Sequence, residues 1–108
     1  VGKAKGKLMI MTGEIIGAQE AYEIGLVEKV VPADELMNAA EELANTIKSK
    51  APIAVAVTKT VVNNGYGLDM KTASALEIEA FTAPFASQDK SEGMLAFLEK
   101  RTPEFKNK

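Results

Sequence analysis

Carboxylates, amines and hydroxyls are the side chains that could do chemistry in this sequence, because it contains no histidine and no cysteine. These absences exclude a Ser-His-Asp or Cys-His nucleophile, the usual zinc sites and a disulfide. Two pairs of acids are close in sequence. On a helix Glu77 and Glu79 would point to different faces, whereas Asp89 and Glu92 would lie one turn apart and could bind a cation. Solvated or helix-stabilising charges explain both pairs more simply, so no catalytic residue and no metal ligand is assigned.

Charge and motif content narrow the choice of partners. The formal net charge is −2 and the pI is about 5.2, which argues against nucleic acid as a partner. Neither a Gly-x-Gly-x-x-Gly nor a Gly-x-x-x-x-Gly-Lys-Ser/Thr motif is present, so the common nucleotide cradles are missing. No apolar run reaches the length needed to cross a bilayer, so no membrane partner is expected. The lack of cysteine fits a reducing compartment, and a cytoplasmic location is expected.

The length suits one small domain and is short for a complete metabolic enzyme, at 108 residues. Hydrophobic residues make up 46% and charged residues 26%, the proportions of an ordinary globular domain. The sequence begins Val1-Gly2, without an initiator methionine or a basic and apolar leader. We therefore expect a piece taken from inside a longer chain.

Hydrophobic periodicity predicts a mainly helical chain. The clearest helix covers residues 34–48, where one apolar stripe is made by Leu36, Ala40, Leu43, Ala44 and Ile47. Gly25 stands where a left-handed residue would end a short helix over 18–24. Ser87 can cap a last helix that runs to about residue 101. The other predicted helices cover residues 2–11 and 68–83.

Some features of the chain are harder to assign. The β-branched stretch 26–31 predicts a short strand that ends at Pro32. Residues 52–63 have strand propensity, yet Pro52 suits a first helical turn, and the pattern favours a helix only slightly. Pro84 is expected to end the helix before it. In the last helix the side chains expected to face inward are Met94, Phe97 and Leu98.

Three stretches carry a resemblance to a known family. In residues 12–27 a Thr-Gly turn leads to an Ala-x-x-Ala helix and then Gly-Leu-Val, with Val-Val-Pro following. Residues 51–54 read Ala-Pro-Ile-Ala and lead to Lys59 and Asn63. The third stretch, residues 81–105, contains Glu-Gly-Met-x-Ala-Phe-Leu-Glu-Lys-Arg. In order and spacing these stretches resemble the C-terminal part of a crotonase-superfamily enoyl-CoA hydratase.

The resemblance implies a fold. It implies the mainly α, C-terminal helical region of the crotonase fold, with one or two short strands and without the catalytic ββα core. Residues 1–33 would be the end of the crotonase-like core, and residues 34–108 a helical oligomerisation region. The ambiguous residues 52–63 are helical in the family.

The resemblance also implies a function in fatty acid metabolism, namely addition of water to 2-enoyl-CoA to give 3-hydroxyacyl-CoA. Two glutamates and a backbone oxyanion hole do this chemistry in the family, and all of them lie upstream of Val1. A region like this one contributes contacts within trimers and hexamers and part of the wall around CoA. The expected partners are thus an acyl-CoA substrate and further copies of the chain, with no separate cofactor.

Two residues match family positions near CoA. Phe81 and Lys100 correspond to residues that approach the adenine or phosphates of CoA bound to an adjacent subunit. Apart from the resemblance, Phe81 could be a core or interface aromatic and Lys100 a solvated charge at a helix end. A different class of function also stays open, an autonomous helical protein-interaction module without catalysis.

Overall fold

The fold consists of helices and connecting segments. The computed structural model describes all residues 1–108, and its elements are six α-helices and one 3₁₀ turn. The chain divides into two compact units, Val1–Ala40 and Glu41–Lys108. None of the helices combines the length and the apolar character needed to cross a membrane.

The first unit begins with two capped helices. Helix α1, Gly2–Thr12, ends at Gly13, whose φ of 67° is left-handed and whose N–H donates to the Met9 carbonyl. Helix α2, Ala18–Glu23, is followed by Gly25 with a φ of 70°. Glycine adopts this conformation without the steric cost of a Cβ atom, which explains why both helices end where the sequence predicts.

The strand predicted at 26–31 does not form. No residue of the chain is in a β-ladder, so this stretch has no strand with which to pair. β-branched residues favour an extended backbone, but an isolated strand leaves its N–H and C=O groups without partners. Here the Leu26 and Val27 N–H groups donate to the Ala21 carbonyl, at 2.8 and 3.3 Å. The mainly α prediction is confirmed, and the expectation of one or two short strands is wrong.

Helix α3, Leu36–Lys48, is the predicted amphipathic helix, entered through the 3₁₀ turn η1, Ala33–Glu35. Its apolar stripe is nevertheless open to solvent. Leu36 is 59% exposed and Leu43 62% exposed. The residues that create the amphipathic pattern therefore have no cover in the structure.

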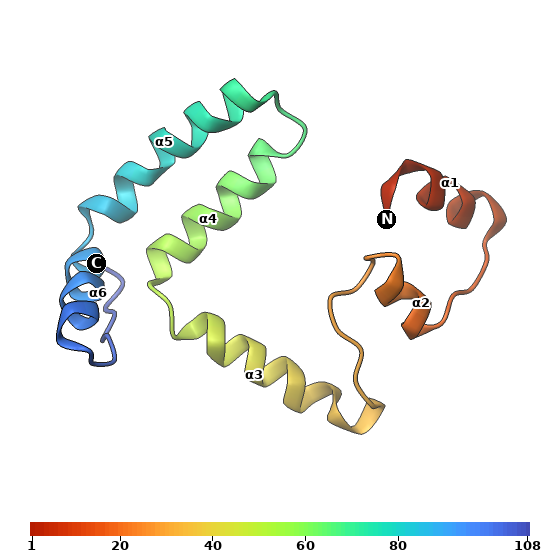
Figure 1. Cartoon of the computed structure of the whole chain (residues 1–108), viewed down its shortest axis with the longest axis horizontal. Coiled ribbons are helices and arrows are strands. Elements are labelled where there is room, and N and C mark those ends of the chain that lie inside the picture. The colour runs from red at the N-terminus through yellow and green to blue at the C-terminus, as the bar shows by residue number, and fades with distance from the viewer. The chain divides into compact units, whose positions relative to one another are not determined.

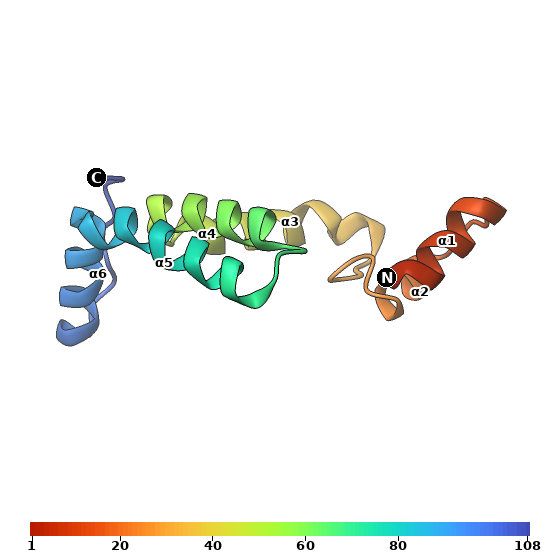
Figure 2. The same cartoon turned by 90° about the horizontal axis from the view of Figure 1, so that it is seen from above.

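The second unit is built on an antiparallel helix pair. Helices α4, Pro52–Gly65, and α5, Met70–Ala86, lie side by side in both views (Figures 1 and 2). Asp69 caps α5, because its carboxylate accepts the N–H groups of Lys71 and Thr72, both at 3.1 Å. The helical alternative for residues 52–63 is thus confirmed. The β-propensity of its valines is outweighed by packing against α5.

Pro84 does not end α5 as expected, since the helix continues to Ala86. A proline in the last turn removes only its own N–H bond, and little of the helix remains to be disrupted. Ser87 directly follows Ala86 and caps helix α6, Gln88–Glu99. Its hydroxyl oxygen accepts the Lys90 N–H at 3.1 Å. Helix α6 ends at Lys100, which has a left-handed φ of 55°.

The chain has very little hydrophobic core. Among apolar side chains only Ala21 and Ala96 are buried. Large apolar side chains are exposed instead, and Phe97 is 82% and Leu98 74% accessible. The expectation that Met94, Phe97 and Leu98 face inward is therefore wrong: on one short helix, the three have too little surrounding chain to cover them.

We predict that the isolated 108-residue chain self-associates. Contiguous exposed apolar surface favours association because burying it releases hydration water. The side chains expected to become covered are Met9, Ile10, Phe81, Phe85, Met94 and Phe97. Sedimentation at micromolar concentrations, together with binding of a hydrophobic dye, tests this. A dye-negative monomer would contradict the prediction.

Candidate functional site

An apolar hollow of about 410 Å³ lies in the second unit where α4, α5, α6 and the C-terminal segment meet. This volume falls in the range of small-molecule sites. Aromatic side chains from three parts of the chain line it, and polar groups are few. The lining residues are Ala51, Ala54, Phe81, Pro84, Phe85, Ser87, Asp89, Lys90, Gly93, Met94, Phe97 and Phe105.

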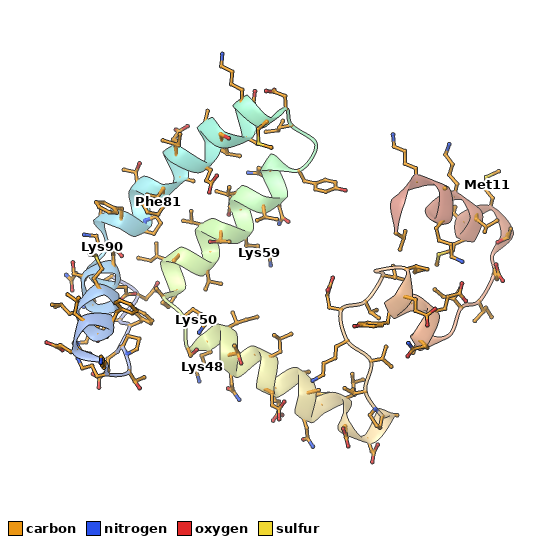
Figure 3. The ribbon with its side chains drawn as sticks, in the orientation of Figure 1. Met11, Lys48, Lys50, Lys59, Phe81 and Lys90 are labelled. Atoms are coloured by element: carbon orange, nitrogen blue, oxygen red, sulfur yellow. The ribbon has the colours of Figure 1, made fainter.

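Phe81, predicted to approach the adenine of CoA, lines this hollow from α5 (Figure 3). The Phe81 and Phe85 rings have centroids 5.6 Å apart and planes inclined by 38°. This tilted arrangement suits the charge distribution of two aromatic rings. Phe81 is 60% exposed and also lines a second hollow of about 240 Å³ between α4 and α5. Its ring is therefore accessible to a flat ligand, as stacking requires.

Lys100, the other predicted CoA contact, is exposed at the C-terminal end of α6 and is not among the residues that line the hollow. The cation in the lining is Lys90, near the start of α6 (Figure 3). Its Nζ atom lies 4.3 Å from the centroid of the Phe85 ring, a cation–π contact. Phe81 and Lys90 thus line the same hollow, and Lys100 does not.

Lys90 was missed by reasoning from sequence. The signal that could have found it is local: the Ser87 cap sets the start of α6 and places Lys90 in its first turn. That turn follows directly on the last turn of α5, which carries Phe85. No catalytic pair of acids is assembled, because Glu77 and Glu79 are exposed and Asp89 is occupied by backbone hydrogen bonds.

An ion-pair network fixes the end of α6. Arg101 donates from Nη1 and Nη2 to the two oxygens of Glu92, at 2.5 and 2.9 Å, and from Nε to Glu99 at 2.6 Å. The Glu104 N–H donates to Glu92 at 2.8 Å. These bonds, those from Arg101 first, lower the pKa of Glu92 from 4.5 to about 2, and Glu92 together with Glu99 raises the pKa of Arg101.

Comparison with known proteins gives the class of the chain. The model of the family described as enoyl-CoA hydratase/isomerase matches residues 1–108. A short-chain-enoyl-CoA hydratase of Clostridium acetobutylicum is 49% identical over 109 residues, which cover all of this chain and 42% of that protein. A crotonyl-CoA hydratase of Syntrophomonas wolfei is 43% identical over 108 residues, with the same two coverages.

Solved structures agree with the sequence relatives. The crystal structure of an enoyl-CoA hydratase from Bacillus anthracis superposes with a TM-score of 0.97 at 42% identity, covering all of this chain and 42% of that one. The chain has the helical architecture of part of the crotonase fold. It belongs to the enoyl-CoA hydratase/isomerase family, as the resemblance predicted. It spans about 42% of the length of the curated relatives it matches first.

The ion pair of Glu92 predicts a pH dependence. Because the folded-state pKa of Glu92 lies near 2 and the usual value is 4.5, its stabilisation is present above 4.5 and is lost as the pH falls from 4.5 to about 2. At neutral pH, Glu92→Gln should lower the thermal midpoint by about 1–3 °C, since the pair is partly exposed. The difference from wild type should disappear towards pH 2.

The test compares the thermal midpoints of the wild type and Glu92→Gln, measured by circular dichroism from neutral pH to pH 2. Glu79→Gln is the matched control, because Glu79 is exposed on α5 and makes no ion pair. A difference between wild type and Glu92→Gln that stayed constant from neutral pH to pH 2 would show that the carboxylate charge is not the cause.

Proposed function

We propose that the chain is the C-terminal region of an acyl-CoA lyase that hydrates 2-enoyl-CoA to 3-hydroxyacyl-CoA in fatty acid metabolism. The observation that carries the proposal is the match over the whole chain, at 49% identity, to a protein named as a short-chain-enoyl-CoA hydratase. The substrate would be an acyl-CoA, with no separate cofactor. A cytoplasmic location goes with this proposal, supported by the absence of cysteine.

Within that enzyme the chain would supply part of the wall around CoA. Support comes from the apolar hollow, since a base can stack on an accessible aromatic face such as Phe81. A lysine suits a phosphate as a point charge, and Lys100 is exposed and unpaired in the structure. The CoA would be bound to an adjacent subunit. Phe81 and Lys100 need not line the same hollow, because they would contact different parts of that CoA, the base and a phosphate.

The chain would also supply contacts between subunits of a trimer or hexamer. Its uncovered apolar faces support this role, because interface cores are apolar and closely packed. The same faces would suit the alternative, an autonomous helical interaction module without catalysis. The match to hydratases over the whole chain favours the enzyme.

The 108-residue chain should be inactive alone, because the two glutamates and the oxyanion hole of the family have no counterparts among its residues. The test follows the absorbance of the crotonyl-CoA double bond in the presence of purified chain. The expected rate equals that of buffer. A hydration rate well above that of buffer would mean that the chain contains catalytic groups, and would refute the proposal that these groups lie outside it.

In the full-length enzyme, Lys100→Ala should raise KM for crotonyl-CoA about threefold to tenfold and leave kcat nearly unchanged. A phosphate contact is the same in the ground and transition states, so its loss appears as uniform binding. The rise should shrink at high ionic strength because the charges are near solvent. Phe81→Ala should also raise KM, with little dependence on salt.

Steady-state kinetics at low and high salt make this measurement. Lys48→Ala is the matched control: Lys48 is also exposed at the end of a helix, but on α3 (Figure 3). An unchanged KM for Lys100→Ala at low salt would contradict the phosphate contact and would show that Lys100 is a solvated charge at the helix end.

A further inference from the structure

The C-terminal segment, residues 103–108, has no helix or strand of its own, yet it is anchored to α6. Asp89 accepts the Lys106 N–H at Oδ1, at 2.7 Å, and the Asn107 N–H at Oδ2, at 2.9 Å. The Asp89 N–H donates to the Lys108 carbonyl at 3.1 Å. Both oxygens of this carboxylate and its backbone N–H are therefore used to hold the segment.

Asp89 is the most deeply buried large side chain of the structure, at 2% exposure. Burying a carboxylate is costly unless hydrogen bonds replace its water, and here two backbone N–H groups do so. One turn further along α6, Glu92 accepts the Glu104 N–H. The segment is thus fixed at two points on the same face of the helix.

Phe105 lies between these two anchors. Its ring comes within 3.5 Å of the place where a Cβ atom on Gly93 would stand, so it packs directly against α6. It also lines the apolar hollow that Phe81 lines from α5. The backbone bonds to Asp89 and Glu92 flank Phe105, and so they determine where its ring stands in the wall.

We propose that Asp89 is a positioning residue for acyl-CoA binding: its buried carboxylate fixes the backbone of residues 106–107 and thereby holds Phe105 as a wall of the hollow beside Phe81. This inference rests on the proposed function, since the ligand is the CoA part of the substrate. Asp89 also lines the hollow, but it is 2% exposed and both of its carboxylate oxygens are bonded to backbone N–H groups, so it acts through Phe105.

The test uses the full-length enzyme with Asp89→Asn, Phe105→Ala and the double variant. An Asn side chain has nearly the same shape but turns one acceptor into a donor facing a backbone N–H. Amide hydrogen exchange at Lys106 and Asn107 should become about tenfold faster in Asp89→Asn. The KM for crotonyl-CoA should rise about threefold to tenfold in both single variants, with kcat nearly constant.

The double variant separates positioning from general damage. If Asp89 acts through Phe105, the double variant should have a KM no higher than the worse single variant, rather than the product of the two effects. Asp34→Asn, an exposed acid near the start of α3, is the matched control and should change neither exchange nor KM. If Asp89→Asn does not fold, Phe105→Ala alone must still raise KM.

Several results would overturn the inference. Unchanged exchange at Lys106 and Asn107 in Asp89→Asn would refute the anchoring, and multiplicative KM effects would refute action through Phe105. If KM rose in Phe81→Ala but stayed unchanged in Asp89→Asn, the positioning role of Asp89 would be refuted and the proposed CoA wall would stand. An unchanged KM in Phe81→Ala would instead refute the proposed CoA wall.

Discussion

Uncovered apolar helix faces are the constraint on which the rest of this structure depends. A helix in a globular protein gains most of its stability by packing an apolar face, and α3 has such a face but leaves Leu36 and Leu43 largely in solvent. More than half the length of the matched relatives lies outside the region that this chain covers. Both facts are consistent with the proposal that the rest of an enzyme and its neighbouring subunits cover these helices.

Where the chain does cover itself, it uses local capping and polar bonds more than a hydrophobic core. Asp69 and Ser87 cap α5 and α6, and glycines end α1 and α2. At the C-terminal end, carboxylates of α6 accept backbone N–H groups from a segment without regular structure. These interactions do not need a large core, which explains how aromatic side chains can stay accessible around a well-defined hollow.

The features that sequence predicted correctly are those set by neighbouring residues. The stripe of α3, the left-handed Gly25 and the Ser87 cap each depend on a short window of sequence. The strand predicted at 26–31 did not form, because a strand needs a second strand to pair with and β-propensity alone does not provide one. The prediction that α5 ends before Pro84 was wrong, because the position of a proline within a helix decides how much of the helix it disrupts.

The candidate site was predicted only in part, for the same reason. Phe81 came from a resemblance in sequence, and the structure places it in a hollow. That Lys90 shares the hollow depends on how α6 follows α5. The bonds that Asp89 accepts from the backbone of residues 106 and 107 join positions far apart in the chain. The contacts of Asp89 with residues 106 and 107 cannot be read from periodicity or from motif spacing.

We propose that the hollow around Phe81 belongs to a CoA site in a larger enzyme. The most direct test is amide hydrogen exchange of the full-length protein with and without a saturating CoA ester, followed peptide by peptide. If the hollow is part of a CoA site, exchange should be slower in peptides from the end of α5 and from α6, and unchanged along α3. Equal exchange in all of these peptides, with and without the CoA ester, would contradict this proposal.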